Sequence, residues 1–306
     1  LAMAKKLIAQ ADVLIESFRP GVMDKLGLGY NEVHALNPRL VYASISGYGA
    51  ASPWAAKSGQ DLLVQSLSGL AWLNGNADQP PMPFALSLAD SYTGVHAAEG
   101  ILACLVRREI TNEGGHVEVS LLASVLDLQF EVITTYLNDG NKAPKRSEFN
   151  NAHAYLAAPY GIYETSDGYI ALAMGSVVEL GQIIGSEQVA SHTDESERFT
   201  NRDAIKRDIQ AVLETDTTAN WLSKLEKHDF WCSDVYTWEK LVASVAFKAL
   251  DFIQDVSRVA GQQVLTTRCP ISFAGEDFGA SKPAPRLGED TGAIIDEFHL
   301  NDTKEA

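Results

Sequence analysis

The segment Leu40-Val-Tyr-Ala-Ser-Ile-Ser-Gly-Tyr-Gly49 decides the fold. Its first part, residues 40–45, is a short apolar run that predicts a buried strand. Ser46-Gly-Tyr-Gly49 predicts a loop, because glycines punctuate regular structure. Val13-Leu-Ile15 is a similar apolar run, and His116-Val-Glu-Val-Ser120 alternates as a third strand. Helical patterns separate these runs, and such alternation is typical of βαβ units around a parallel sheet.

The strongest helical pattern of the chain lies at residues 91–109. Ala98, Ile101, Leu102 and Leu105 recur there at spacings of three and four residues, which places them on one face of a helix. We therefore predict an α/β fold with an open, mostly parallel, Rossmann-like sheet and helices on both faces. Further helices are predicted at residues 1–10 (the end of a helix), 30–36, 60–73, 121–137 and 221–227.

The character of the sequence changes near residue 138. We predict that residues 1–138 form the first part of a large α/β domain and that the polar, breaker-rich residues 139–154 form a linker. A smaller α+β domain is expected at 155–245, with a β-hairpin at 160–173 whose turn is Asp167-Gly168. Residues 257–306 are expected to contain short strands, and the C-terminal segment 246–306 is expected to return to the large domain.

Composition narrows the class of protein. The chain has 306 residues, with 40 acidic against 24 basic side chains and a net charge of −16, which argues against a nucleic-acid partner. Its three cysteines and seven histidines show no metal-ligand spacing, so no metal site is predicted. We find no membrane-spanning apolar run and no signal peptide, and therefore expect no membrane association and a cytoplasmic location.

Asp90 lies in Ala85-Leu-Ser-Leu-Ala-Asp-Ser-Tyr-Thr-Gly94, just before the long predicted helix. One interpretation is a helix N-cap, since aspartate is among the preferred capping residues. The other is a nucleophile, because the positive end of the helix dipole keeps a carboxylate ionised and an ionised carboxylate can attack a thioester. Position alone leaves both interpretations open.

A set of motifs in fixed order resembles the class III CoA-transferase family, the family of formyl-CoA transferase and carnitine CoA-transferase. The resemblance extends over nearly the whole chain, and so many motifs in order are more specific than any single one. These motifs are Glu16-Ser-Phe-Arg-Pro-Gly21, Leu26-Gly-Leu28, Asn37-Pro-Arg-Leu40, Ser44-Ile-Ser-Gly47, Asp61, Ser68-Gly69, Asp90 with Gly94, Gly100-Ile-Leu-Ala103, Arg107-Arg108, Val117-Glu-Val-Ser-Leu121 and Pro283-Ala-Pro-Arg-Leu-Gly-Glu289.

The resemblance implies that Asp90 is the nucleophile of an acyl-CoA:carboxylate CoA-transferase. The implied mechanism passes through an aspartyl-acyl anhydride and an aspartyl-CoA thioester. It requires no metal or redox cofactor, and its substrates are acyl-CoA and small carboxylic acids. The resemblance also implies an intertwined homodimer.

The same resemblance implies which residues surround Asp90. The region of Phe18 and Arg19, with Lys25, resembles a CoA-contacting segment, and Arg39 and Lys57 are further candidate cations for the phosphates. Backbone N–H groups of the loop Gly47, Tyr48 and Gly49 are candidate oxyanion donors. The segment containing Asn151 and His153 resembles a flexible segment that covers the aspartate in the family, although the run of glycines found there in formyl-CoA transferase is absent.

Two alternatives remain. Alpha-methylacyl-CoA racemases share the fold but place a histidine base before the residue that matches Asp61, where this chain has Gln60. An amide cannot exchange protons near neutral pH, so a two-base racemase is disfavoured. The chain also begins within a predicted helix, whereas family members open with a strand–helix unit that contacts CoA. We therefore expect that unit to lie outside this sequence, and a truncated, inactive chain that only dimerises is the other alternative.

Overall fold

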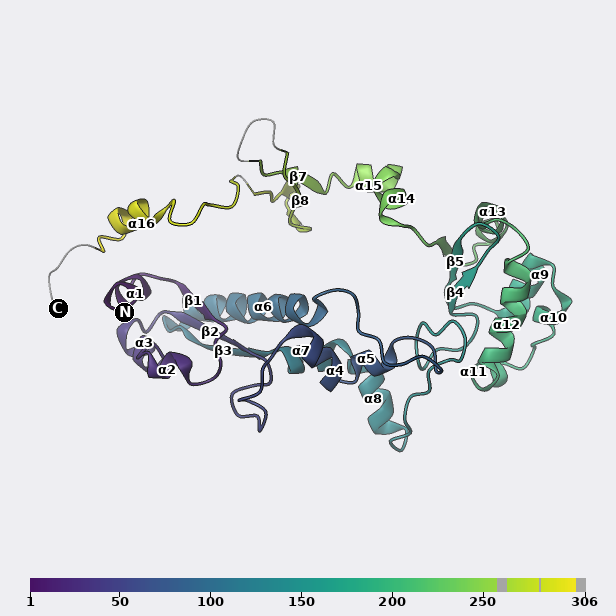
Figure 1. Ribbon diagram of the computed structural model, residues 1–306, viewed down its shortest axis with the longest axis horizontal. Helices are drawn as coiled ribbons and strands as arrows, with labels where there is room; N and C mark the ends of the chain where they lie inside the picture. The colour runs from purple at the N-terminus through teal and green to yellow at the C-terminus, as the bar shows by residue number, and fades with distance from the viewer. Residues whose placement is uncertain (258–262, 281, 301–306) are drawn as a thin grey trace. The chain divides into compact units, whose positions relative to one another are not determined.

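A computed structural model describes residues 1–257, 263–280 and 282–300 (Figure 1). The chain divides into two compact units, Leu1–Asp234 and Val235–Ala306. The first unit contains the parallel sheet and every residue that the sequence analysis assigned to the site.

Three parallel strands form the sheet of the first unit. They are β1 (Val13–Glu16), β2 (Val41–Ser46) and β3 (Gly115–Ser120), paired in the order β1-β2-β3. Val13 lies opposite Val41, and Val41 lies opposite Gly115, so all three strands end at the same edge. The predicted parallel α/β sheet is confirmed, with strand bounds within one or two residues of those predicted.

Helices cover both faces of this sheet, as predicted. The long helix α6 (Leu88–Thr111) packs Ile101 against Val41 and Ala43 on one face. Gly100 brings the helix backbone close to the sheet, because a Cβ there would lie 2.7 Å from Val117 Cγ1. On the other face Tyr42 packs in a cluster from three short helices, α1 (Ala2–Ile8), α2 (Val22–Lys25) and α3 (Tyr30–Leu36).

Two predicted helices are each divided in the structure, so these predictions are wrong in their continuity. The segment 60–73 forms α4 (Asp61–Leu67) and α5 (Leu70–Leu73), because Gly69 adopts a left-handed φ of 83° that ends the first helix. The segment 121–137 forms α7 (Leu121–Leu128) and α8 (Phe130–Asn138). They meet at Gln129, which leaves the helical conformation with φ −95° and ψ 13°.

A smaller α+β region follows within the same unit. Its antiparallel sheet contains β4 (Gly161–Glu164), β5 (Tyr169–Leu172) and β6 (Cys232–Asp234). The predicted hairpin is confirmed, since the Thr165 N–H donates to the Gly168 carbonyl across the turn at 2.9 Å. The accompanying helices are α9 (Val177–Ile184), α10 (Glu187–Ala190), α11 (Glu197–Thr200), α12 (Arg202–Leu213) and α13 (Thr218–Glu226).

The second unit contains short elements. Strands β7 (Ile253–Asp255) and β8 (Leu265–Thr267) pair antiparallel, as do β9 (Ser272–Phe273) and β10 (Glu276–Asp277). The helices are α14 (Trp238–Ala243), α15 (Val245–Ala249) and α16 (Thr291–Glu297), for none of which the sequence analysis named a range. Among the described residues of the whole chain, none of the helices has the length and apolar character needed to cross a membrane.

Candidate active site

Asp90 lies in the first turn of α6 and is not its N-cap. The N-cap is Ser87, whose side chain makes no capping hydrogen bond, and Asp90 is the third residue of the helix. The N-cap interpretation of Asp90 is therefore wrong. Its carboxylate lies in the first turn all the same, where it meets the positive end of the helix dipole.

A second carboxylate, Asp61 at the start of α4, holds the first turn of α6. The backbone N–H of Asp90 donates to Asp61 Oδ2 with an N···O distance of 3.1 Å. The other oxygen, Asp61 Oδ1, accepts from Gln65 Nε2 at 2.6 Å. Asp61 is 9% exposed and Gln65 is 1% exposed, so this connection between α4 and α6 is shielded from water.

The environment disfavours the ionised form of Asp90. Partial burial, and secondly the negative charge of Asp61, raise the pKa of the Asp90 carboxyl above its ordinary value. The Asp90 side chain itself remains largely exposed. A carboxylate of increased basicity that is open to a ligand suits a nucleophile.

A cavity of about 440 Å³ lies in front of Asp90. It gathers residues from the carboxyl ends of β1 and β2 and from α6, which is the edge at which open α/β folds bind ligands. Four other residues predicted for the site line it together with Asp90: Phe18, Arg19, Gly47 and Lys57. The structure thus brings two cations into the same cavity as the candidate nucleophile.

The loop after β2 is held in a fixed shape. Gly49 adopts a left-handed φ of 86°, and its N–H donates to Ser46 Oγ at 3.0 Å. Tyr48 is 6% exposed and its hydroxyl donates to the Ser58 carbonyl at 3.2 Å. Its ring lies at the edge of Trp54, over which the Lys57 ammonium is placed 4.9 Å from the ring centroid. These contacts connect the loop to the segment that carries Lys57.

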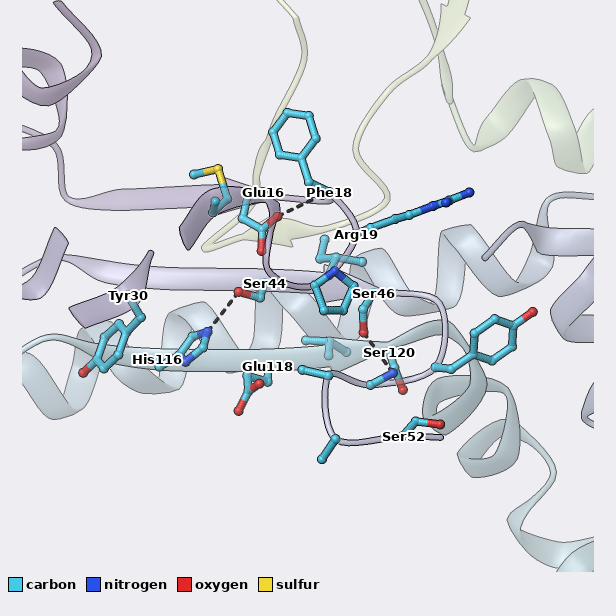
Figure 2. Close-up of a pocket in the computed structure, with 18 of the residues that line it drawn as sticks. Glu16, Phe18, Arg19, Tyr30, Ser44, Ser46, Ser52, His116, Glu118 and Ser120 are labelled. Carbon is cyan, nitrogen blue, oxygen red and sulfur yellow. Dashed lines mark hydrogen bonds between the residues drawn. The ribbon is translucent and has the colours of Figure 1, made fainter. Parts of the chain in front are cut away.

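A second, larger cavity of about 710 Å³ shares the wall formed by Phe18 and Arg19 (Figure 2). Tyr48 and Gly49 line this cavity and not the one that contains Asp90. Its floor is a polar face of the sheet, where Ser44 Oγ lies 2.9 Å from His116 Nε2. Arg19 therefore faces both cavities, and its Nη2 donates to Ser58 Oγ at 2.9 Å.

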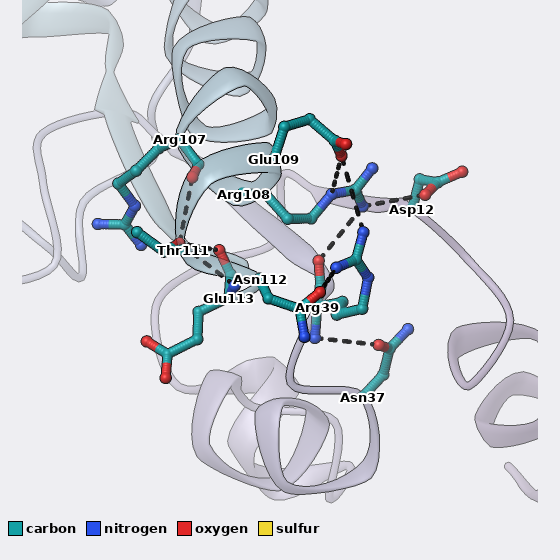
Figure 3. A network of polar contacts seen from close by, with 9 residues as sticks. All are labelled: Asp12, Asn37, Arg39, Arg107, Arg108, Glu109, Thr111, Asn112 and Glu113. Carbon is teal, nitrogen blue, oxygen red and sulfur yellow. Dashed lines mark hydrogen bonds and ion pairs between the residues drawn. The ribbon is translucent and has the colours of Figure 1, made fainter.

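Arg39 lies away from both cavities, because it precedes β2 whereas the cavities lie where the strands end. Its guanidinium pairs with Glu109 at 3.7 Å and contacts Asn112 at the end of α6 (Figure 3). This geometry gives a CoA-binding role of Arg39 no support. Lys25, the last residue of α2, is exposed and lines neither cavity in the part of the chain that the structure describes.

The remaining predicted residues lie beside the cavity or outside it. Gln60 immediately precedes α4 and is adjacent to Gly59, which lines the Asp90 cavity. Asn151 is bound to the loop at residues 73–76, with Nδ2 donating to the Gly75 carbonyl at 3.0 Å. His153 Nε2 lies 3.9 Å from Glu131. Neither Asn151 nor His153 lines either of these two cavities.

Gln65 and Thr93 have supporting roles at the site that were not predicted from the sequence. Gln65 Oε1 accepts from the Phe84 N–H at 2.8 Å and its Nε2 donates to the Leu86 carbonyl at 3.2 Å. Thr93 is 1% exposed, lines the Asp90 cavity and donates to the Ala89 carbonyl at 2.6 Å. The sequence signal for these roles is that each is a polar residue on the apolar face of its predicted helix.

The sequence profile of CoA-transferase family III matches residues 1–291 of the chain. The chain belongs to CoA-transferase family III. The predicted family and the predicted enzyme class, transfer of CoA, are thereby confirmed. Within the described residues, no group of three or more histidine, cysteine, aspartate or glutamate side chains is arranged to hold a metal ion.

Proteins similar to this family III chain include two bacterial CoA-transferases and a bacterial protein of known structure. The acetyl-CoA:oxalate CoA-transferase of Acetobacter aceti is 31% identical over 99% of this chain and 78% of its own length. The succinate–glutarate CoA-transferase of Agrobacterium fabrum is 29% identical over 97% of this chain and 75% of its own length. A crystal structure of a CaiB/BaiF family protein from Brucella suis superimposes with a TM-score of 0.81 at 31% identity, over 97% of this chain and 78% of that one.

Proposed function

We propose that this enzyme transfers CoA from an acyl-CoA to a small carboxylic acid, with Asp90 as the covalent nucleophile. The observation that carries the proposal is the cavity that places the Asp90 carboxylate together with Arg19 and Lys57 at the carboxyl edge of the sheet. Membership of family III supports the class of reaction.

The proposed reaction is a double displacement in which no atoms are gained or lost. An Asp90 carboxylate oxygen attacks the thioester carbonyl, a C–O bond forms, the C–S bond breaks, and CoA leaves as the thiolate. The thiolate then attacks the Asp90 carbonyl of the anhydride, releasing the donor acid as its carboxylate and leaving an aspartyl-CoA thioester. The acceptor carboxylate repeats these two steps in reverse and departs as the new acyl-CoA.

The cavity supplies what this chemistry needs. Each attack creates a negatively charged tetrahedral intermediate, which fixed N–H donors and cations stabilise. Lys57 and Arg19 provide positive charge at the cavity wall, and the Gly47 backbone lies in the same lining. An ionised carboxylate needs no general base for its own activation, so this role does not require a neighbouring proton acceptor.

The similar enzymes guide the choice of substrates. Their names pair acetyl-CoA with oxalate and succinate with glutarate, so we propose short dicarboxylic acids as the first acceptors to test. A panel of acyl-CoA donors and acids, followed by mass spectrometry of the CoA thioesters, identifies the pair.

We also propose that the active enzyme is a homodimer. Helix α6 exposes an apolar stripe of Leu102, Val106 and Ile110, which are 62%, 65% and 83% exposed. Such a stripe on a helix is typical of a surface that a partner covers. We expect light scattering to give the mass of a dimer and Val106→Glu to shift it toward the monomer. A wild-type monomer at micromolar concentration would contradict this part of the proposal.

The decisive experiment concerns Asp90. Asp90→Asn cannot form the anhydride, so transfer should fall by a factor of about 10³ or more while the fold is retained. Incubation of the wild-type enzyme with an acyl-CoA and hydroxylamine should modify residue 90 and leave the Asn variant unmodified. Asp203→Asn is the matched control, because Asp203 also lies in the first turn of a helix, α12. An active Asp90→Asn enzyme would overturn the assignment.

A further inference from the structure

The first turn of α6 lacks a local cap and is held from another helix. Ser87, the N-cap, makes no side-chain hydrogen bond to the turn. The first N–H groups of a helix have no partner within it, so an external acceptor is needed. Asp61 supplies one, because its Oδ2 accepts from the N–H of Asp90 itself at 3.1 Å.

Asp61 is held rigidly in this role. Gln65, one turn further along α4, donates to Asp61 Oδ1 at 2.6 Å. The same Gln65 amide bonds Phe84 and Leu86 in the segment that leads into α6, accepting from the Phe84 N–H and donating to the Leu86 carbonyl. The approach to α6 and its first turn are therefore both attached to one face of α4.

Asp61 carries a negative charge without an ion-pair partner among the residues that the structure describes. Among residues 1–257, 263–280 and 282–300, no lysine, arginine or histidine forms an ion pair with Asp61, although Asp61 is 9% exposed. A carboxylate so placed is stabilised by N–H donors and by the positive ends of α4 and α6. Its charge acts on its neighbour, Asp90, whose pKa rises partly for this reason.

We propose that Asp61 is a positioning residue for the nucleophile. It fixes the backbone of Asp90 through its Oδ2 and keeps a second carboxylate beside that of Asp90, so that the Asp90 side chain is held where it lines the cavity. The inference rests on the proposed function of Asp90 and adds to it the residue that prepares the nucleophile for attack.

Two substitutions separate orientation from charge. Asp61→Asn removes the charge and keeps one oxygen, which can still accept one of the two hydrogen bonds. Asp61→Glu keeps the charge on a longer side chain that misplaces it. Misplacement of a reacting group by about 1 Å lowers rates by about 10²-fold, so we expect both variants to form the Asp90 adduct about 10- to 100-fold more slowly.

The pH dependence distinguishes positioning from general structural support. Without the Asp61 charge, the pKa of Asp90 falls, so the acid limb of the rate profile should move to lower pH in Asp61→Asn. It should stay near the wild-type position in Asp61→Glu. Asp167→Asn is the matched control, because Asp167 Oδ1 likewise accepts a backbone N–H at the start of a helix, from Thr218 at 2.8 Å. We expect this control to change stability alone.

The measurement is the single-turnover rate of adduct formation on residue 90, followed by mass spectrometry across pH. If the wild-type enzyme forms no adduct, the proposed function fails, whatever the variants do. If the wild-type adduct forms and Asp61→Asn reproduces its rate and pH profile, the positioning role is wrong while the proposed function stands. A shift of the profile in Asp167→Asn equal to that in Asp61→Asn would also overturn the positioning role.

Discussion

Gly47 and Gly59 touch through their backbones, and neither position has space for a side chain. A Cβ on Gly47 would lie 2.6 Å from Gly59 Cα, and a Cβ on Gly59 would lie 2.5 Å from Gly47 Cα. Both residues line the cavity that contains Asp90. The contact therefore joins the loop after β2 to the segment that leads into α4. It fixes how closely these two parts of the cavity wall approach each other.

Gly47→Ala is expected to destabilise the protein and to reduce activity. The methyl group meets backbone that cannot rotate away, so the loop or the segment before α4 must move, at a cost of about 1–3 kcal/mol in the free energy of unfolding. Urea unfolding measures this cost. Gly94→Ala is the control, because its Cβ would meet nothing within 4 Å and alanine favours the helix. A Gly47→Ala protein as stable as Gly94→Ala would contradict the close contact.

Asp90→Asn is expected to stabilise the protein slightly at neutral pH. Partial burial and the Asp61 charge raise the pKa of Asp90 in the folded state. Between the unfolded and folded pKa values the folded protein binds more protons, so wild-type stability falls as pH rises through that window. The amide removes this penalty, which we expect to be below about 1 kcal/mol because the side chain is largely exposed.

Thermal unfolding at pH 7 and below pH 4 tests this expectation. The difference in midpoint between Asp90→Asn and the wild type should be present at pH 7 and should shrink below the ordinary aspartate pKa, about 3.9. A difference in midpoint that does not depend on pH would show that folding does not raise the pKa of the Asp90 carboxyl.

Part of the fold follows from local sequence patterns. The strands β1 and β2 are predictable because each is a short run with many apolar residues that pack against helices. Strand β3 is predictable from its alternation, because Val117 packs beside α6 whereas His116 and Glu118 line the larger cavity. The breaks at Gly69 and Gln129 are harder to predict, because the apolar periodicity continues across each break and only the backbone conformation changes.

The site is predictable only where the motifs contain its residues. Asp90 and Arg19 stand within such motifs, and the structure places both in one cavity. The bond between Asp61 and Asp90 joins residues 29 positions apart, and no local pattern encodes which distant acceptor a helix turn will find. Arg39 also stands within a motif, Asn37-Pro-Arg-Leu40, but it precedes its strand. The edge of a sheet that binds ligands is where the strands end.

Lys206 is expected to make the protein more stable as pH rises. This side chain of α12 is 1% exposed, and its ammonium donates to Ser147 Oγ at 3.2 Å and to the Asn150 carbonyl at 3.0 Å. Burial, and secondly the charge of Arg202, lower its pKa to about 8. Between about pH 8 and the ordinary lysine value near 10.4, the unfolded chain binds more protons, so stability increases with pH.

Lys206→Met should remove this increase while filling a similar volume. We expect the stability of the wild type relative to Lys206→Met to grow by at most about 3 kcal/mol between pH 7 and pH 10, as measured by urea unfolding. Lys227→Met, at an exposed position after α13, is the control. If the free energy of unfolding changes with pH in the same way for the wild type and Lys206→Met, burial does not lower the pKa of Lys206.

Arg19 and Arg39 provide a paired test of where CoA binds. Arg19 faces both cavities at the carboxyl edge of the sheet, whereas Arg39 pairs with Glu109 before β2. If the CoA phosphates lie near Arg19, Arg19→Ala should raise the KM for acyl-CoA about 10-fold or more, because a charge-assisted hydrogen bond is lost. Arg19→Lys keeps the charge without the bidentate fork, so its KM should lie between that of the wild type and that of Arg19→Ala.

Arg39→Ala is the control. It should leave KM unchanged and cost less than about 1 kcal/mol of stability, as expected for an exposed ion pair. Initial-rate kinetics at low and high salt measure these effects, since salt should weaken the contribution of Arg19. An equal rise in KM for Arg19→Ala and Arg39→Ala would remove the basis for placing CoA at the carboxyl edge of this sheet.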